Sequence, residues 1–347
     1  MQTYLVTQPG LEATTAAELR GLGLKVPRIG RGGLAVRMAT TELYAANLHL
    51  RTASRVLLRV GEGHVENFAQ LATLVEGVPW ARWLRPDVGS STVKVACTRS
   101  RLNHTGAVEE RVLEQLGSLG GGTIHVRIAD NIATLSIDSS GEHLHRRGWR
   151  LETAKAPLRE TLAAAVLLTS GWCGETPLHD PMCGSGTIVI EAALLAAGLA
   201  PGRNRSFAFE QWPEFRPDAW AAVRSRMPDP RPVSVSIVGT DRDAGAIDAA
   251  RANAKRAGVA DLVRFDVSAI GAVRPAEGAL IVTNPPYGNR VQGGDPRNLF
   301  AALGQIAGSC PVAVIAPDRN LVGRIRPGII ERFATSNGGI PVKVFTG

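Results

Sequence analysis

The chain has few residues that cross-link or anchor a protein. Its 347 residues include four cysteines and no Cys-x-x-Cys pair, which excludes a zinc ribbon and a disulfide framework and fits a reducing cytosol. The N-terminus has neither the basic start nor the apolar core of a signal peptide. The longest apolar run, around residues 162–168, is too short to cross a membrane. We therefore expect a cytoplasmic protein with no membrane partner and no metal site.

Lysine is also scarce. Five of the 39 basic residues are lysine and the rest are arginine, and the net charge is +8. A basic protein of this kind often binds nucleic acid, although an arginine bias that serves solubility is the alternative. The apolar content of 44% is that of a folded protein, and the length allows two or three domains.

The first 150 residues predict an α+β region in two units, 1–50 and 51–150. The first unit reads as β-α-β-β-α, half of a ferredoxin-like pattern, with Thr40 or Thr41 capping its second helix. Its strands are expected at 4–7, 26–29 and 34–38, and its helices at 12–22 and 42–48. The second unit has expected strands at 54–60, 93–98, 125–128 and 133–138, and helices at 68–75 and 108–116.

After a linker at 151–157, a third domain at 151–347 alternates strand and helix. Strands are expected at 178–180, 233–238, 263–265, 279–283 and 311–316, followed by a hairpin of 329–335 with 341–345. The helix at 244–257 has Asp243 as its N-cap and Gly258 as its stop. This alternation predicts an α/β domain whose parallel sheet is covered by helices on both faces.

Basic residues gather in two places. Arg99 and Arg101 form one cluster, and Arg146, Arg147 and Arg150 form a second one among His143, His145 and Trp149. Such clusters can bind nucleic-acid phosphates beside an aromatic ring. A solvated edge strand whose charges block aggregation would give the same pattern, and the spacing leaves both interpretations open.

A glycine-containing loop lies at the centre of the chain, within residues 178–191. An apolar strand ends at Asp180, and a loop with Gly184 and Gly186 leads into an apolar helix. Glycines let the backbone approach a ligand, and the free amides of a helix N-terminus can meet a polar or anionic group. The loop lacks the third glycine of the dinucleotide fingerprint, so by itself it is equally consistent with an ordinary tight turn. Cys183, within the loop, is expected to pack in the core.

Carboxylates follow three successive predicted strands. Asp180, Asp241 and Asp266 stand at the strand ends, where sheets of this type bind ligands. Asp241 is placed to accept hydrogen bonds from ribose hydroxyls, and Asp266 could accept one from an adenine amino group. The alternative for each is that it caps the next helix.

The fourth strand of this domain ends in Asn284-Pro285-Pro286-Tyr287-Gly288. The prolines fix the backbone and remove two amide donors, so the nearby carbonyl oxygens and the Asn284 side chain are left as acceptors. Converging acceptors suit a bound amino group, and Tyr287 suits a planar ring. An exocyclic amine is conjugated, and acceptors on its hydrogens free its lone pair for reaction. A proline-rich turn with a core tyrosine is the alternative.

These motifs carry a family resemblance. The C-terminal domain resembles the class I S-adenosylmethionine-dependent methyltransferases, which have a Rossmann-like, mostly parallel seven-stranded sheet. The whole chain resembles the RNA guanine-N2 methyltransferases that carry an N-terminal THUMP domain. The matching stretches are 180–187, 284–290, 138–150, and Ala200-Pro201-Gly202 followed by Arg205, Phe207 and Trp212.

The resemblance implies S-adenosylmethionine as cofactor and RNA as partner. The cofactor residues it implies are Arg159, Thr161, Asp180, Met182, Gly184, Ser185, Gly186, Thr187, Asp241, Arg242 and Asp266. Arg242 is a departure, because the family has a small or apolar neighbour of the adenine there. Asn284, Pro285 and Tyr287 would receive the target base and form the catalytic set. The N-terminal region would bind RNA, with Arg99, Arg101, Arg146, Arg147 and Arg150 as candidates, while the base is flipped into the site.

The expected reaction is in-line methyl transfer to the N2 amine of a guanine, without a covalent enzyme intermediate. The chain ends soon after the catalytic sheet, which favours a tRNA acceptor stem over 23S ribosomal RNA, and we expect a monomer. A DNA adenine-N6 methyltransferase and a catalytically silent RNA-binding protein are the remaining hypotheses.

Overall fold

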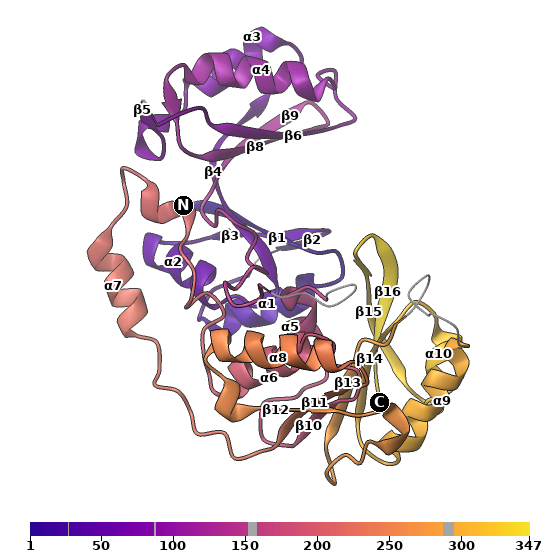
Figure 1. Ribbon diagram of the computed structural model, residues 1–347. Helices are drawn as coiled ribbons and strands as arrows, with labels where there is room; N and C mark the ends of the chain where they lie inside the picture. The colour runs from indigo at the N-terminus through magenta and orange to yellow at the C-terminus, as the bar shows by residue number, and fades with distance from the viewer. Residues whose placement is uncertain (27, 87, 152–157, 287–294) are drawn as a thin grey trace.

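The protein is built on two seven-stranded sheets. The computed structural model describes residues 1–347 except 27, 87, 152–157 and 287–294 (Figure 1). Residues 152–157 of the linker predicted at 151–157 therefore lie outside the described residues, as does Tyr287. The strands of the first sheet come from the first 138 residues, and those of the second sheet begin at Leu178. Both sheets carry helices, which confirms the predicted α/β class and the α+β region before it.

The first sheet starts as a complete ferredoxin-like unit. Its elements are β1 (Gln2–Thr7), α1 (Glu12–Gly21), β2 (Arg28–Gly30), β3 (Gly33–Arg37), α2 (Thr40–His49) and β4 (Ala53–His64). The strand order β2-β3-β1-β4 is that of the β-α-β-β-α-β motif. Neither Thr40 nor Thr41 caps α2, so that prediction is wrong. The N-cap is Ala39, whose N–H donates to the Glu42 carboxylate at 2.6 Å.

Strand β4 continues this sheet into the second unit. The further elements are α3 (Phe68–Glu76), β5 (Arg85–Pro86), β6 (Thr92–Thr98), α4 (Thr105–Leu116), β7 (Leu119–Gly120), β8 (Thr123–Ala129) and β9 (Ile132–Asp138). The full order is β2-β3-β1-β4-β9-β8-β6, and β5 pairs with β7 separately. Figure 1 shows α3 and α4 on one face of the β4-β9-β8-β6 half. The domain boundary at residue 50 stays a prediction, since β4 belongs to both halves.

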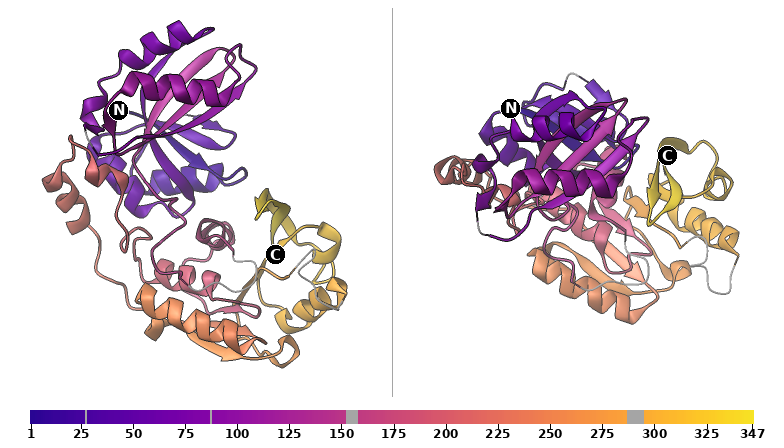
Figure 2. Two further views of the ribbon diagram at one scale, coloured as in Figure 1. Left: turned by 45° about the horizontal axis from the view of Figure 1, so that its top comes forward. Right: turned by 90° about the horizontal axis from the view of Figure 1, so that it is seen from above.

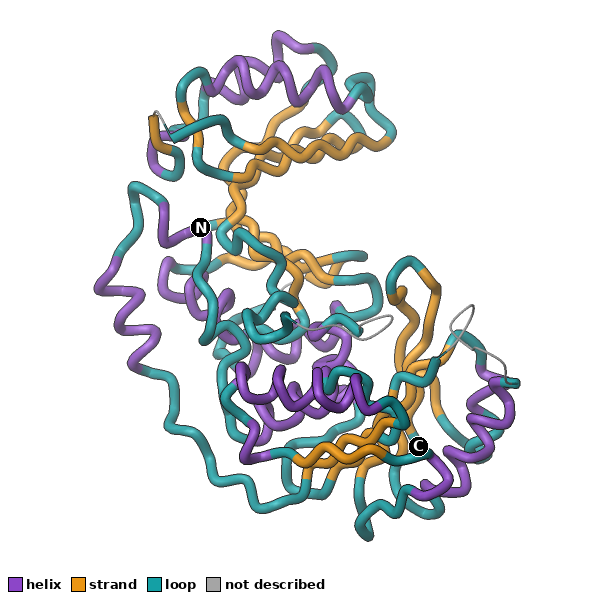
Figure 3. The backbone as a smooth tube through the Cα atoms, viewed as in Figure 1, coloured by secondary structure: helices purple, strands orange, loops and turns teal. Residues whose placement is uncertain are grey.

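The second sheet is mostly parallel, as predicted. Its strands are β10 (Leu178–Asp180), β11 (Ile237–Asp241), β12 (Arg264–Val267), β13 (Leu280–Thr283), β14 (Val312–Ala316), β15 (Ile330–Asn337) and β16 (Ile340–Thr346), in the order β12-β11-β10-β13-β14-β16-β15. Among these strands β16 runs opposite to the other six, so it is antiparallel to both β14 and β15. Figure 3 shows the hairpin of β15 and β16 extending beyond the rest of this sheet.

Helices bury both faces of the second sheet. They are α5 (Glu160–Thr169), α6 (Thr187–Ala196), α8 (Ala244–Ala257), α9 (Pro296–Ala307) and α10 (Arg319–Val322). Leu280 and Val282 of β13 pack in the core formed with α5, α6 and α8, whereas Ile281 between them packs with α9 and α10. This two-sided burial explains why the strands read as continuous apolar runs.

The two halves of the chain are tightly joined. Helix α7 (Pro217–Ser225) packs against α2 (Figure 2), and the ring of Phe209 stacks on that of Tyr44 at 4.2 Å between centroids. On the opposite side, Leu11 is fully buried within the core of the second sheet. The side chain of Gln8 also donates to the carbonyl of Ser336 in β15. No helix among the described residues is long and apolar enough to span a membrane.

Candidate functional site

Three of the predicted residues meet at one edge of the second sheet. Strand β10 lies between β11 and β13, and all three run parallel. Their carboxyl ends therefore bring Asp180, Asp241 and Asn284 to the same edge. Strands β11 and β12 lie on one side of β10, and β13 lies on the other side. Strand β10 therefore marks the topological switch point, where such sheets bind ligands.

Asp180 is a buried carboxyl group in this edge. It is 1% exposed and accepts a hydrogen bond from the Met182 amide at 3.1 Å. Burial raises the pKa of Asp180 to about 7, and repulsion from Asp241 adds to this rise. Burial also raises the pKa of the Cys183 thiol well above its usual value. Cys183 packs in the core as predicted, and a thiol of this kind is a poor nucleophile.

The glycine loop is shaped by its neighbours in the sheet. Gly184 and Gly186 have φ values of +52° and +82°, a backbone region that favours glycine. The Gly184 amide donates to the Asp241 carboxylate at 2.9 Å. A Cβ on Gly186 would lie 2.9 Å from the Phe265 ring. Both glycines are therefore needed by the fold of the loop itself, whatever it binds.

The other loop residues fix the start of α6. The carbonyl of Ser185 accepts from Asn253 at 3.1 Å, and the side chains of Ser185 and Thr187 are buried. Met182 is partly buried and packs against the core near α9. Gly186 is the N-cap and Thr187 the first residue of α6, so the loop forms the strand-turn-helix that the sequence predicts.

The end of β11 carries an ordered carboxylate. Asp241 accepts from the Asp243 amide at 3.0 Å as well as from Gly184. Asp243 caps α8 by accepting from the amides of Gly245 and Ala246, as predicted. Arg242 is exposed. Asp241, not Arg242, is thus the ordered polar group that faces the glycine loop.

Asn284 presents an acceptor without a partner. Its Oδ1 is buried and has no hydrogen-bond partner among the described residues. Pro285, next in the chain, is buried. A buried acceptor left unpaired costs free energy, so such groups mark positions completed by a ligand or water.

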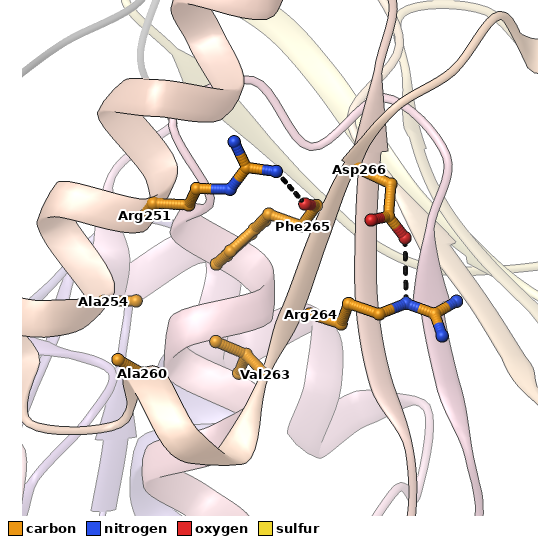
Figure 4. Close-up of a pocket in the computed structure, with 7 residues that line it drawn as sticks. All are labelled: Arg251, Ala254, Ala260, Val263, Arg264, Phe265 and Asp266. Carbon is orange, nitrogen blue, oxygen red and sulfur yellow. Dashed lines mark hydrogen bonds and ion pairs between the residues drawn. The ribbon is translucent and has the colours of Figure 1, made fainter.

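Asp266 stands near the carboxyl end of the next strand, where it pairs in register with Thr240, one residue before Asp241. It stands on the outermost strand, β12, and its carboxylate pairs with Arg264 at 2.8 Å. Figure 4 shows a pocket between α8 and β12, with the Asp266 carboxylate on the opposite side of the strand from the Phe265 ring. Asp180, Asp241 and Asn284 do not line this pocket. We therefore place the candidate site at the strand ends and not in the pocket of Figure 4.

The start of α5 supplies further residues. Arg159 is the exposed N-cap of α5, and Thr161 is 1% exposed. Glu160 between them is buried and pairs with Arg150 at 3.0 Å. Burial raises the pKa of Glu160 to about 7, although Arg150 counteracts the rise. Arg150 also donates to the Leu158 carbonyl at 2.6 Å, so it holds the start of α5.

The predicted RNA-binding arginines fall into two groups. Arg99, Arg101 and Arg146 are exposed, and each pairs with a carboxylate: Asp130, Glu66 and Glu142 respectively. Arg147 and Arg150 are turned inward. Arg147 is 2% exposed and donates to Glu191, to the Leu144 carbonyl and to the Arg51 carbonyl. A guanidinium so placed cannot reach a phosphate, and we withdraw Arg147 and Arg150 from the RNA-binding set.

The segment 139–150 is a loop and not the edge strand considered above. Arg205 holds it through four backbone carbonyls, those of Ser140, Glu142, His143 and Arg146, at 2.7–3.0 Å. Sequence reasoning missed this role, although Arg205 is among the residues of the family resemblance. It also missed Arg51 and Glu191, which form a buried ion pair at 3.7 Å between the two halves. Such pairs cannot be predicted from the sequence, because their members lie far apart in the chain.

Within the described residues, no group of three or more histidine, cysteine, aspartate or glutamate side chains could hold a metal ion. The strand-end residues instead fit an organic cofactor with an amine, hydroxyls and a base. Asp180 and Asp241 offer carboxylates, and the glycine loop offers backbone beside them.

Comparison with known proteins decides the family. The model described as "RMKL-like, methyltransferase domain" matches residues 147–340. The chain belongs to this RMKL-like methyltransferase family. A second model, described as "RlmL ferredoxin-like domain", matches residues 2–57, in agreement with the ferredoxin-like order of β1 to β4. The predicted class I fold and S-adenosylmethionine dependence are confirmed at the level of this family.

Similar proteins cover the whole chain. The ribosomal RNA large subunit methyltransferase K/L of Syntrophotalea carbinolica is 38% identical over 87% of this chain and 47% of its own length. The protein of the same name from Vibrio cholerae is 33% identical over 98% of this chain and 52% of its own. The chain thus spans about half the length of these curated RMKL-like relatives. The crystal structure of SMU.472, a putative methyltransferase complexed with SAH, superposes with a TM-score of 0.89 at 26% identity, covering 99% of this chain and 97% of that one.

Proposed function

We propose that this protein transfers a methyl group from S-adenosylmethionine to the exocyclic N2 amine of a guanine in large-subunit ribosomal RNA. The observation that carries the proposal is the buried Oδ1 of Asn284 at the switch point of the sheet, which has no hydrogen-bond partner among the described residues. An N–H group of a flipped base would satisfy it. The same Oδ1 would draw the amine hydrogens away from the ring and leave the lone pair free to attack.

The chain contributes alignment to this reaction. S-adenosylmethionine, when bound, supplies a methyl group that its sulfonium already makes electrophilic. Asp180 and the glycine loop would hold its methionine end, Asp241 its ribose hydroxyls, and Arg159 and Thr161 the near side of the methionine. Asn284 and Pro285 would place the amine in line with the methyl group, with Tyr287 as a platform for the base. Positioning of this kind supplies a large part of a transfer barrier.

The choice of ribosomal RNA rests on the relatives. The curated proteins to which the chain is similar are named for the large ribosomal subunit, so we propose this target in place of the tRNA acceptor stem. The N-terminal region, which resembles a ferredoxin-like unit followed by a THUMP domain, would bind the RNA. We also propose that the protein acts in the cytoplasm as a monomer.

The test is methyl transfer from labelled S-adenosylmethionine into total ribosomal RNA, tRNA and duplex DNA, all from cells that lack the gene. We expect N2-methylguanosine in large-subunit RNA and its loss in Asn284→Ala. Asn320→Ala, an exposed asparagine on α10, is the matched control and should retain activity. S-adenosylhomocysteine binding, measured by calorimetry, should survive in both variants.

The other outcomes separate the alternatives. Label in tRNA alone would refute the ribosomal target and keep the chemistry. N6-methyladenine in DNA would overturn the RNA assignment. Cofactor binding without label in any nucleic acid, with RNA still bound, would favour a catalytically silent RNA-binding protein.

A further inference from the structure

One face of the first sheet carries no helix. The apolar side chains of Val93, Ile124 and Ile137 are buried under α3 and α4. Side chains alternate along a strand, so Lys94, His125 and their cross-strand partners occupy the opposite face. Figures 1 and 2 show no described helix over that face.

A row of polar and cationic residues crosses this face. Register pairs link Lys94 to His125, His125 to Ser136, and Ser136 to Arg59. Thr3 pairs with Leu58, so Gln2 and Arg59 come next to each other, and Gln2 pairs with Arg37. The row therefore runs over six strands from β6 to β3. Arg127 stands beside it, paired with Ala96 of β6.

The cations of this face lack carboxylate partners. In the described part of the chain no ion pair joins Lys94, Arg127, Arg59 or Arg37 to a carboxylate, in contrast to Arg99 and Arg101. Lys94, Arg127 and Arg37 are exposed. Arg59 lies over the Tyr4 ring at 4.8 Å.

Two of the carboxylates of this region are already engaged. Asp138 is buried and paired with Arg55, and Glu42 accepts from the Ala39 amide. Glu62 remains on the face, opposite Thr134. A hollow at one end of the row is lined by Gln2, Lys25, Arg37 and Arg59 as well as by Glu42. The balance of charge on this face is therefore positive, which suits a polyanion.

The face leads towards the candidate methyl-transfer site. Beyond the row lie His143 and His145, whose rings stack at 5.4 Å. Burial lowers the pKa of His143, and the positive charges of Arg55, Lys94 and Arg159 lower it further. Burial lowers the pKa of His145 to about 3, and Arg159 again contributes. Arg159 at the start of α5 acts on both rings, and Lys94 on the sheet acts on that of His143. The amide of Leu144, between the two histidines, donates to the Ser54 carbonyl of β4 at 2.9 Å, so this segment lies against the first sheet.

We propose that the helix-free face of the first sheet binds the phosphate backbone of RNA, along the row from Arg37 through Arg59 to Lys94 and Arg127. From this row the RNA strand passes His143 and His145 and reaches Arg159. This inference rests on the proposed function and names the surface that holds its substrate. The occupant is an RNA backbone because the contacts are cationic and lie in a line across six strands.

The test compares two charge-matched variants of the full chain. Lys94→Glu with Arg127→Glu reverses two cations of the face. Arg20→Glu with Arg226→Glu reverses two exposed cations elsewhere and makes the same change in net charge. Binding of a labelled 20-nucleotide oligouridine is titrated by anisotropy over roughly 50–200 mM salt. Calorimetry with S-adenosylhomocysteine and a thermal melt check the fold of each variant.

We expect the face variant to bind the oligonucleotide on the order of tenfold more weakly at about 0.1 M salt, with a salt slope smaller by about 1.4, the contribution of two phosphate contacts. The control variant and cofactor binding should be unchanged. Equal RNA binding by both variants would overturn the inference. So would a wild-type protein that ignores RNA and self-associates or captures an acidic protein through Lys94 and Arg127.

The failure of this inference differs from that of the proposed function. If the face variant loses RNA affinity while the wild-type protein methylates no RNA, the surface stands and the proposed reaction fails. If the wild-type protein methylates ribosomal RNA and the face variant binds RNA with the wild-type slope, the reaction stands and the surface fails.

Discussion

The two sheets of this protein use their side chains in opposite ways. The second sheet is buried on both faces, and its polar groups stand at strand ends, where Asp180, Asp241 and Asn284 meet. The first sheet is buried on one face and displays its polar groups across the other. Strand ends place a few groups at fixed positions, which suits a reaction. An open face repeats similar groups over a distance, which suits a long charged ligand.

The cations follow the same division. On the first sheet Lys94 and Arg127 are exposed, whereas at the junction with the second sheet Arg147 and Arg51 are buried around Glu191. Exposed charges keep their hydration and are available to a ligand, but buried ones have lost it and depend on their partners. Residue type alone therefore does not tell a binding arginine from a structural one.

The largest expected effect comes from breaking the buried cluster. Arg147→Met leaves the Glu191 carboxylate without its nearest guanidinium, and removal of one member of a buried pair costs about 3–5 kcal/mol. Urea unfolding should show this loss. Adding Glu191→Leu should restore only part of the stability, because the buried Arg51 then loses its carboxylate partner. A mild effect of Arg147→Met alone would contradict the interior role of Arg147.

The second-largest effect distinguishes the roles of the two sheets by kcat and KM. Asn284→Ala should lower kcat for RNA methylation on the order of 100-fold or more, as for loss of one preorganised transition-state contact. Lys94→Ala should raise KM for RNA and leave kcat nearly unchanged, because it removes ground-state binding. Steady-state kinetics with unmodified ribosomal RNA would measure both. A fall of kcat in Lys94→Ala would show that the face takes part in alignment.

The third effect is a pH dependence set by Asp180. Its pKa is raised from 3.8, the ordinary value of an aspartate, to about 7 in the folded protein, so the folded state retains a proton that the unfolded chain releases above about pH 4. Stability from this group is present below that pH and is lost as the pH rises towards 7, by at most about 1.4 kcal/mol per pH unit. Asp180→Asn should flatten this slope in chemical unfolding between about pH 4 and 7. An identical slope in the variant would refute the protonated state.

The smallest effect is expected at the exposed pairs. Arg99→Ala breaks a fully exposed pair with Asp130, and surface pairs of this kind often contribute nothing measurable. The unfolding midpoint should not move, and RNA affinity should change less than in Lys94→Ala. A larger loss of RNA affinity in Arg99→Ala than in Lys94→Ala would make the cluster of Arg99 and Arg101, and not the sheet face, the main RNA contact.

Much of this fold was predictable because local signals agreed with it. Helix α8 has the predicted bounds, since Asp243 caps it and Gly258 ends it with φ of +66°. Strand β11 was expected at 233–238 and lies at Ile237–Asp241. Gly239 read as the end of that strand, yet it pairs with both Asp180 and Phe265 and is a sheet residue. Only the neighbouring strands reveal that a glycine there gives room to the Phe265 ring.

The site was predictable to the extent that it lies at strand ends. Asp180, Asp241 and Asn284 converge because parallel strands share an edge, which the order of elements implies. The sequence did not show which of the candidate RNA-binding arginines are buried. Arg147 pairs with Glu191, which lies 44 residues away in the chain, and nothing local marks the pair. The row from Lys94 to Arg37 was invisible as well, because its members come from six strands and adjoin only in the folded sheet.

The burial of Leu11 in the second core has a consequence for anyone who would exchange parts between relatives. Leu11 follows β1 closely in the sequence, yet it belongs to a core that includes Leu162 of α5 and has Phe333 of β15 packed against it. A chimaeric protein joined at the junction of the two halves would place the side chain of residue 11 from one parent in the core of the other parent's second sheet. A substitution at residue 11 must therefore be matched by substitutions in this core, which couples the ferredoxin-like unit to the domain of the second sheet in spite of their separate sheets.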